Sequence, residues 1–529
     1  MKHFRAFVLL LLAVLVGGSV VGLTGCEPRE DIVTRDPGAT LTTSADTIFF
    51  DTVFVSRGSL TKRFWVHNRN RKAVRIDEIS LANATTSPTA LFELTIDGRP
   101  GPARRDFELR GRDSLLVLVK VTIDPNAADT AFLVLDSVRL RANGTTRYVQ
   151  LQAYGENARY YTAPTGFLPV VACDTTWTDR RPIVLLKTTI VDSACVLTIA
   201  PGTRVYAAAG ASLLVLGQLR CGALGVGVPA VTFRGLRRDD YYDVRDPRFA
   251  QLSAFFAKYA FVPGQWGGLI FRPTRGPHQT AVNELLNTVI RNPNVGVQIF
   301  NPYFLPGSRL RIDGCVIRTA YDVGVYGVGA AQEPGGQVEL NNTVIAHCGQ
   351  RAVVGIGGGV WRLTHCTIEM SQTVFSRRET EAVAFNNGVE LAPGVVRSSP
   401  TRLTIENSIL WSGLRDKEGN LQNELLLLRQ GSNSDSSYTF RHNLLQTTFP
   451  RFNTDGVTYG AGTALTNVLN EDPRFANMSS RLLNLRLDSL RSPARRLGAP
   501  LTPPVLTDLP GNLRDAARPS AGSYESPLL

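Results

Sequence analysis

The chain is poor in lysine, histidine and methionine. Only 7 of its 57 basic residues are Lys, and its 529 residues include 6 His and 3 Met. The basic residues, almost all Arg, are scattered among acids, and no Lys/Arg block of the kind that follows a phosphate backbone occurs. The formal net charge of +12 therefore indicates no nucleic-acid partner, although it is compatible with an acidic polysaccharide.

Cysteine is also scarce, with 7 residues, and no two of them form a C-x-x-C pair. This absence argues against a zinc ribbon, because such sites need closely paired thiolates. The sequence leaves open whether Cys173 pairs with Cys195. It also leaves open whether Cys221 and Cys348 form disulfides. Oligomeric state is left open as well.

The usual catalytic motifs are missing. We find no nucleophile elbow, P-loop, dinucleotide fingerprint or H-E-x-x-H. Asn453-Thr-Asp-Gly456 shares three residues with a polygalacturonase motif, but it lacks that motif's partners and is interpreted as a loop turn. His347 has no identifiable nucleophile or carboxylate partner. We therefore predict no catalytic residue and no cofactor, and we lean away from an enzyme.

The composition is that of a folded, turn-rich β protein. Hydrophobic residues make up 43% and charged residues 19%, with 47 Gly and 30 Pro. That balance excludes a wholly disordered chain and suits β structure better than a helical bundle. Because a single core stops growing near ~250–300 residues, the length predicts several domains, or one domain plus an elongated repeat architecture.

The N-terminus has the order of a secretory signal. Lys2 and Arg5 precede an apolar run, and Leu23-Thr-Gly-Cys26 supplies small residues before a Cys. These four residues resemble the lipobox of bacterial lipoproteins, in which cleavage precedes the lipidated Cys. The resemblance implies a signal peptide at 1–25, a membrane anchor on Cys26, a tether at 26–43 and a mature charge of +10. An uncleaved membrane anchor is the alternative.

The same resemblance implies an address. It places the protein at the outer membrane or cell surface of a Gram-negative bacterium, with the leaflet left open. The acids Glu27, Glu30 and Asp31 loosely resemble the surface-export signal of some Gram-negative lipoproteins. A solvated tether explains these acids equally well.

Residues 44–157 alternate apolar and polar positions with period 2. Examples are Phe64/Val66 and the run from Leu115 to Ile123, and turn signals such as Asp97-Gly98 separate the runs. Many short strands in about 110 residues predict a β-sandwich. The run 115–125 followed by 149–155 resembles immunoglobulin-like (Ig-like) accessory domains of bacterial envelope proteins.

An internal repeat organises residues 158–470. Six segments share one pattern, apolar at the first and last positions and small or hydrogen-bonding at the fourth. They are residues 285–290, 312–317, 340–345, 363–368, 405–410 and 440–445. The third position is always Asn, Gly or His, the types that tolerate positive φ. Each segment therefore predicts a strand, a one-residue left-handed corner and a second strand, and buried thiols are expected at Cys315 and Cys366.

The spacing of the segments predicts stacked coils. Successive fourth positions lie 27, 28, 23, 42 and 35 residues apart, and a third strand follows several segments, as at 295–297, 323–325, 352–354 and 424–428. Three short parallel strands per turn predict a parallel β-helix with ladders of like residues, the longer gaps holding loop insertions.

Further residues strengthen this prediction. Leu197–Val205, Leu214–Leu219, Pro229–Phe233 and Trp266–Phe271 resemble coils of parallel β-helix proteins, and residues 472–475, 492–494, 508–514 and 521–525 resemble their C-terminal closing segment, here 471–529. The arrangement resembles uncharacterised envelope lipoproteins with right-handed parallel β-helix repeats. That resemblance implies an all-β fold, an Ig-like sandwich followed by a right-handed β-helix, and an envelope location. It implies no activity.

One acidic and aromatic segment is the candidate binding site. It comprises Asp239, Asp240, Tyr241, Tyr242 and Asp243, with Trp266 beyond it. Aromatic rings suit stacked sugars and carboxylates suit Ca²⁺, although an insertion packed on the flank of the solenoid explains the same residues. A short helix is predicted after it, since apolar residues recur with helical spacing between 249 and 259. No other metal site is predicted.

Two functions remain open at this stage. The first is a lipid-anchored protein with a non-catalytic binding or structural role towards glycans or other envelope components. The second is a polysaccharide lyase or glycoside hydrolase. A flat β face lined by aliphatic, Thr and Asn residues would favour the first function. A groove on one β face with two or more carboxylates, or with Arg or Lys beside a carboxylate, would favour the second.

Overall fold

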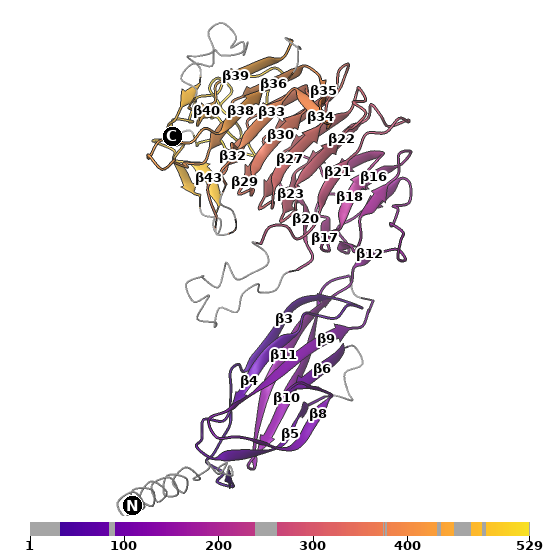
Figure 1. Cartoon of the computed structure of the whole chain (residues 1–529), viewed down its shortest axis with the longest axis vertical. Helices are drawn as coiled ribbons and strands as arrows, with labels where there is room; N and C mark the ends of the chain where they lie inside the picture. The colour runs from indigo at the N-terminus through magenta and orange to yellow at the C-terminus, as the bar shows by residue number, and fades with distance from the viewer. Residues whose placement is uncertain are drawn as a thin grey trace, which may run out of the picture. The chain divides into compact units, whose positions relative to one another are not determined.

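The computed structural model describes residues 32–83, 90–127, 129–237, 262–373, 375, 378–430, 435–448, 467–478 and 483–527. All regular secondary structure in these ranges is β-strand (Figure 1). Within the same ranges no helix has the length and apolar character needed to cross a bilayer. The chain divides into two compact units, residues 1–127 with 131–156, and residues 128–130 with 157–529.

The first unit has two sheets that share one hydrophobic core. One sheet holds β1 (Val33–Thr34), β5 (Ala73–Leu81), β10 (Phe132–Ala142), β11 (Thr145–Glu156) and β3 (Thr47–Phe54) in that order, with β8 (Ala103–Leu109) paired to β5. The other holds β2 (Thr42–Thr43), β4 (Lys62–His67), β9 (Ser114–Ile123), β6 (Ala90–Ile96) and β7 (Arg99–Pro100). The period-2 pattern is confirmed in β9, where every second residue is buried.

The first unit begins earlier than the sequence predicted. Val33–Thr34 pairs with β5 and Thr42–Thr43 pairs with β4. Ala39 and Leu41 between them are 6% and 2% exposed. Within the predicted tether 26–43, these residues belong to the first unit, because their short strands pair with its sheets and their apolar side chains pack in its core.

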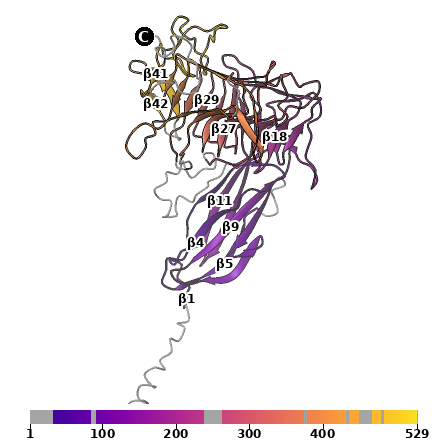
Figure 2. The same ribbon diagram turned by 45° about the horizontal axis from the view of Figure 1, so that its top comes forward.

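The second unit contains three long parallel sheets, and the chain visits them in turn (Figures 1 and 2). This order is consistent with a parallel β-helix, and one continuous hydrophobic core lies inside it. The nine-stranded sheet comprises β13 (Thr175–Trp177), β16 (Val196–Ile199), β19 (Gln218–Cys221), β22 (Val282–Leu286), β25 (Arg309–Asp313), β28 (Gln337–Asn341), β31 (Gly359–Thr364), β36 (Thr401–Glu406) and β39 (Ser437–Arg441).

The other two long sheets complete each coil. The eleven-stranded sheet comprises β12 (Arg159–Tyr161), β14 (Ile183–Leu185), β17 (Arg204–Ala207), β20 (Val231–Gly235), β23 (Thr288–Arg291), β26 (Val316–Arg318), β29 (Val344–Ala346), β32 (Thr367–Glu369), β37 (Ile409–Trp411), β40 (Leu444–Leu445) and β41 (Val468–Leu469). The eight-stranded sheet comprises β15 (Thr189–Val191), β18 (Ser212–Val215), β21 (Gly268–Phe271), β24 (Val297–Phe300), β27 (Val323–Val328), β30 (Arg351–Ile356), β33 (Val383–Asn386) and β38 (Leu425–Leu428).

The predicted corners are confirmed at all six positions. Each corner residue has φ between 44° and 64° and separates a strand of the nine-stranded sheet from one of the eleven-stranded sheet. These residues are Asn287, Gly314, Asn342, His365, Asn407 and His442. The ladders are confirmed as well, since Ile312 pairs in register with Leu285 on one side and Leu340 on the other.

Two predictions about the coils need additions. The 42-residue gap before position 408 holds β33 and an inserted hairpin, β34 (Gly388–Ala392) with β35 (Val395–Ser398). Cys173 and Cys195, whose pairing the sequence left open, form a disulfide near the first coils. Cys221, Cys315, Cys348 and Cys366 are free and buried, and burial raises the pKa of the Cys366 thiol to about 12. The predicted helix within 246–259 lies outside the described residues.

Candidate functional site

The outer face of the nine-stranded sheet carries charged side chains. In β25, Leu310 and Ile312 belong to the core, so Arg309, Arg311 and Asp313 project from the opposite face, because successive side chains of a strand alternate. The neighbouring strands are in register with β25. Like positions of successive coils therefore form rows along the stacking direction, about 4.8 Å apart.

The first row alternates in sign. Each member pairs in register with the next: Arg220, Glu284, Arg311, Glu339 and Arg362. Arg311 Nη1 lies 3.9 Å from Glu284 Oε1. Opposite charges facing each other across neighbouring strands stabilise a sheet modestly, and here they leave donors and acceptors side by side on the surface.

A second row runs beside the first. It consists of Asp313, Asn341, Thr364, Glu406 and Arg441, again in register. Arg311 Nη2 donates to Asp313 Oδ2 at 2.7 Å, and Arg441 Nη1 lies 3.5 Å from Glu406 Oε1. The two rows together make a surface in which most carboxylates have a guanidinium neighbour.

Residues of the C-terminal segment turn this surface into a groove. The C-terminal side of a cavity of about 680 Å³ is lined by Pro500, Leu501, Thr502, Pro503 and Val505. Its other lining residues are members of both rows together with Val282 and Arg309. We call this cavity the charged groove. Its lining contains Glu284, Glu339 and Glu406 beside Arg309, Arg311, Arg362 and Arg441, so its charges nearly balance.

Burial perturbs one carboxyl beside the charged groove. The Asp313 side chain is 9% exposed. Burial raises the pKa of Asp313, and the hydrogen bond from Arg311 opposes that rise only in part. For Arg311, burial alone would lower the pKa, but Asp313 and the nearby glutamates raise it above its usual value. Asp313 is therefore protonated more readily than an exposed Asp, while the neighbouring Arg311 stays charged.

The corner residues fix the C-terminal segment in place. Asn407 Nδ2 donates to Ala499 O at 2.8 Å, and Ala499 N donates to Asn407 Oδ1 at 3.0 Å. Asn342 Nδ2 donates to Thr507 O at 2.9 Å. These contacts flank residues 500–505, so the wall of the charged groove is tied to the coils at both ends.

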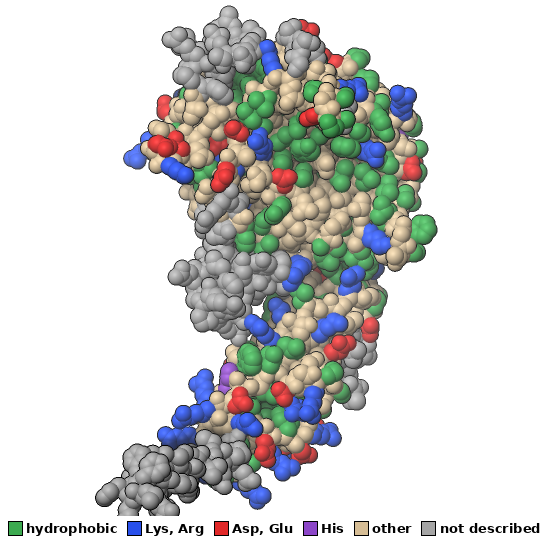
Figure 3. Space-filling view, viewed as in Figure 1, with side chains coloured by type: hydrophobic (Ala, Val, Ile, Leu, Met, Phe, Trp, Pro, Cys, Tyr) green, Lys and Arg blue, Asp and Glu red, His purple; other side chains and the backbone are tan. Residues whose placement is uncertain are grey.

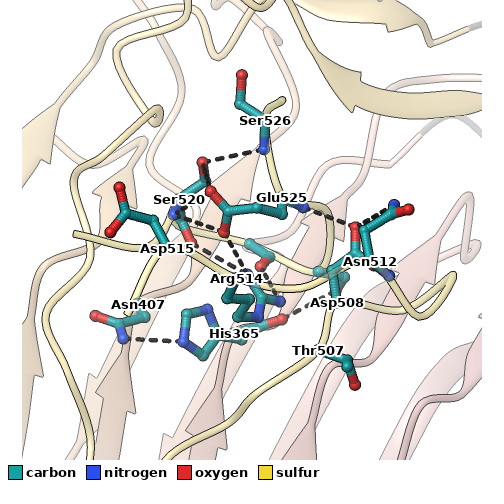
Figure 4. Close-up of polar contacts among 12 residues, drawn as sticks. His365, Asn407, Thr507, Asp508, Asn512, Arg514, Asp515, Ser520, Glu525 and Ser526 are labelled. Carbon is teal, nitrogen blue, oxygen red and sulfur yellow. Dashed lines mark hydrogen bonds and ion pairs between the residues drawn. The ribbon is translucent and has the colours of Figure 1, made fainter. Parts of the chain in front are cut away.

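A buried polar network continues this attachment (Figure 4). Arg514 Nη2 donates to Asn342 Oδ1 at 2.7 Å, and Arg514 Nη1 lies 3.4 Å from Glu525 Oε2. His365 Nε2 is 3.0 Å from Asn407 Nδ2. Burial, and then the charge of Arg514, hold the pKa of His365 well below its usual value. His365 and His442 thus occupy the corners predicted for them and contact the structure around the C-terminal segment.

His347 does have a carboxylate partner, which sequence reasoning missed. Its Nε2 lies 3.1 Å from Glu369 Oε2, and both side chains are almost fully buried. The signal was the register, because Ala346 pairs with Glu369 on the next coil. His347 Nε2 also lies 3.2 Å from Met478 O. The pair is covered by the C-terminal segment and is not open to a substrate.

The outer face of the eight-stranded sheet is different in character. Tyr326, Val354, Ala384 and Leu426 pair in register along it, and they line a shallow cavity of about 430 Å³. Hydrophobic side chains gather over the strands labelled β27, β30 and β33 in Figure 1 (Figure 3). The face of the nine-stranded sheet, with its charged groove, thus meets the criterion for an enzyme. The mainly aliphatic face of the eight-stranded sheet meets the criterion for a binding or structural role.

Of the predicted binding residues, only Trp266 lies within the described chain. It is fully buried, its indole Nε1 donates to Arg291 O at 2.8 Å, and its ring stacks on Phe233 with centroids 6.1 Å apart. Asp239, Asp240, Tyr241, Tyr242 and Asp243 lie outside the described residues, as does Cys26. The sugar or Ca²⁺ site therefore stays a prediction, and no cluster within the described ranges brings together enough acidic, His or Cys side chains for a metal ion.

The charged groove itself was not predicted, although its signal stood in the repeat. The position immediately before the first four segments is occupied in turn by Glu284, Arg311, Glu339 and Arg362. Alternation of strand side chains sends this column outward once its neighbours face the core. The apolar columns alone do not predict this alternation of charge.

Comparisons with known proteins show no family. No family model and no curated protein matches the chain. Solved structures that match include a family 123 glycoside hydrolase from Clostridium perfringens, at 11% identity over 22% of this chain and 28% of that chain, with a TM-score of 0.16. The E. coli chaperone DraB matches at 13% identity over 22% of this chain and 55% of that chain, and the CooA pilin subunit from enterotoxigenic Escherichia coli at 12% over 22% and 95%, both with TM-scores of 0.16. Likenesses this weak carry no argument.

Proposed function

We propose that the protein is a lipid-anchored component of a Gram-negative cell envelope that binds a glycan in the charged groove without altering it. In this proposal Cys26 carries the anchor at the outer membrane, residues 44–157 form an Ig-like domain, and the coils wind as a right-handed β-helix, the hand that parallel crossover connections favour. The observation that carries the binding role is the row of alternating Arg and Glu side chains in the charged groove.

The chemistry of that row suits hydroxyl-rich ligands. A sugar hydroxyl both donates and accepts hydrogen bonds, guanidinium groups only donate, and carboxylates only accept. Arg311, Glu339 and Arg362 follow one another along the stacking direction, so an extended glycan would meet donors and acceptors in turn. The near balance of charge disfavours a uniform polyanion, which would face three carboxylates beside four guanidinium groups.

A polysaccharide lyase or glycoside hydrolase is the second candidate function. It is favoured by carboxylates beside Arg in the charged groove and by the raised pKa of Asp313, since a general acid must hold its proton near the working pH. We prefer binding without turnover, because Asp313 is buried, is bonded to Arg311 and lies outside the residues that line the charged groove.

A glycan array and a depolymerisation assay with the full-length protein separate the two candidates. We expect retention of one glycan class with no new reducing or unsaturated ends. Glu339→Gln with Arg362→Gln should weaken retention by about tenfold or more, since hydrogen bonds to charged groups contribute ~1.5–3 kcal/mol. Release of new ends would refute the non-catalytic role in favour of the enzyme. If the protein binds no glycan and releases no new ends, both candidate functions are refuted.

The anchor has its own test. Cells expressing the full-length chain should incorporate labelled palmitate into the protein, and Cys26→Ala should abolish that label. Cys221→Ala is the control, because Cys221 is buried in the core. Equal labelling of the Cys26→Ala variant would refute lipidation at this residue.

A further inference from the structure

A further cavity lies at the turns that follow strands of the eight-stranded sheet. It measures about 430 Å³ and is lined by Leu216, Arg272, Pro273, Thr274, Arg275, Tyr303 and Leu305. Leu216 follows β18, residues 272–275 follow β21, and Tyr303 follows β24. Because these strands pair with one another in that order, three successive coils build the cavity.

The turns that hold these side chains are fixed by hydrogen bonds. Thr274 Oγ1 donates to Leu216 O at 3.0 Å. The buried Asn301 amide spans the next turn, with Nδ2 donating to Leu305 O and Oδ1 accepting from Leu305 N, both at 2.9 Å. The backbone beneath Arg272, Arg275 and Tyr303 is therefore set before any ligand arrives, which lowers the entropy lost on binding.

The cavity combines positive charge with an apolar base. Arg272 and Arg275 are exposed, and among the described residues neither guanidinium has a carboxylate within ion-pair distance. Tyr303 is 66% exposed, so its ring is available for stacking. In the charged groove guanidinium groups neighbour carboxylates, whereas the described part of the chain places no carboxylate in an ion pair with Arg272 or Arg275.

The cavity and the charged groove lie on either side of a small pocket that has lining residues in common with each. Arg272, Pro273 and Thr274 also line a small pocket that reaches Arg309, and Arg309 lines the charged groove. This small pocket, of about 10 Å³, makes Arg272 a neighbour of the charged groove.

We infer that this cavity is the anionic subsite of the glycan site, where Arg272 and Arg275 bind the carboxylate of an acidic sugar while Tyr303 stacks on its ring. The inference rests on the proposed glycan-binding function and adds the class of sugar. Planar guanidinium groups bind carboxylates through paired hydrogen bonds, and aromatic side chains suit the apolar face of a ring. One end of the bound glycan then carries a uronic acid, while the neutral sugars occupy the charged groove.

The test measures binding of a uronate-terminated oligosaccharide to the full-length protein by calorimetry, beside its methyl ester and beside inorganic phosphate. We expect the acid to bind at least about tenfold more tightly than the ester, and phosphate to bind far more weakly. Arg272→Gln with Arg275→Gln should remove the preference for the acid while leaving binding of the ester unchanged. Arg147→Gln, at an exposed Arg of the first unit, is the matched control.

The outcomes separate this inference from the function on which it rests. Equal binding of acid and ester, or a preference that survives in the double variant, would overturn the anionic subsite while the glycan-binding role stands. Phosphate binding as tight as that of the acid would overturn the assignment to a sugar. Binding of neither oligosaccharide form would overturn the subsite, and the glycan array then decides whether the glycan-binding role falls with it.

Discussion

The corner residues combine a backbone requirement with a contact. Asn407 has φ of 50°, a region that Asn tolerates and most residues avoid. Its amide also makes both hydrogen bonds to Ala499. The first property was predictable from the repeat, since column three holds only Asn, Gly and His. The second was not, because the sequence does not show that residue 499 returns to this corner.

Replacing Asn407 separates these two contributions. We expect Asn407→Ala to lower the free energy of unfolding by about 2–3 kcal/mol, because it adds strain at positive φ and leaves the Ala499 groups without their partner. Asn407→Gly, which accepts the backbone angle, should cost less. Urea unfolding measures both, and equal stability of the Ala and Gly variants would contradict the argument from φ.

His365 makes stability depend on pH. Its pKa is held well below 6.5 in the folded chain by burial and by Arg514, so the unfolded chain binds the extra proton more readily. Stability is therefore fully present above pH 6.5 and is lost as pH falls below it, by about 1.4 kcal/mol per pH unit at most. Urea unfolding between pH 7.5 and 5 should show this loss, and His365→Gln should reduce it. An unchanged slope in the variant would exclude His365 as its source.

At the scale of the element, the coils were the most predictable part of the chain. Each segment has apolar first and last positions, a residue tolerant of positive φ at the third and a small or hydrogen-bonding residue at the fourth. Each coil then stacks on the preceding coil. Insertions were less predictable. β34 and β35 form a local antiparallel hairpin. The described parts of the other coils hold no equivalent hairpin, so it carries no repeat signal.

The disulfide between Cys173 and Cys195 closes a loop across the first coils, with a sequence separation of 22. Removing it frees the unfolded chain, and a loop of this size corresponds to about 3 kcal/mol in the chain-entropy model. We expect Cys173→Ser with Cys195→Ser to lower the denaturation midpoint of the coils. Reductant should lower the midpoint of the natural chain and leave that of the double variant unchanged. A shift of the variant by reductant would show that another bond is responsible.

At the scale of the second unit, the three outer faces differ because the chain treats them differently. The face of the nine-stranded sheet carries the charged groove, and that of the eight-stranded sheet is mainly aliphatic. On the face of the eleven-stranded sheet, residues of the C-terminal segment pack against later strands such as β29, β37 and β40. This segment includes the hairpin β42 (Phe475–Asn477) with β43 (Asn484–Leu487). The closing role of residues 471–529 was predicted from resemblance, whereas the face that they cover follows only from the structure.

Removing this cover should expose the sheet beneath it. Val344, Ala346 and Leu444 are at most 1% exposed, and Leu485, Leu487 and Ala521 pack in the same apolar clusters. Deletion of residues 483–529 should therefore increase binding of the dye ANS and promote aggregation, since a solenoid needs its outer apolar surface capped. Leu506→Ser with Leu513→Ser is the control, because these side chains are 67% and 79% exposed and should leave both readings unchanged. A deletion variant that stays monomeric and binds no more ANS than the full chain would show that the segment does not protect this face.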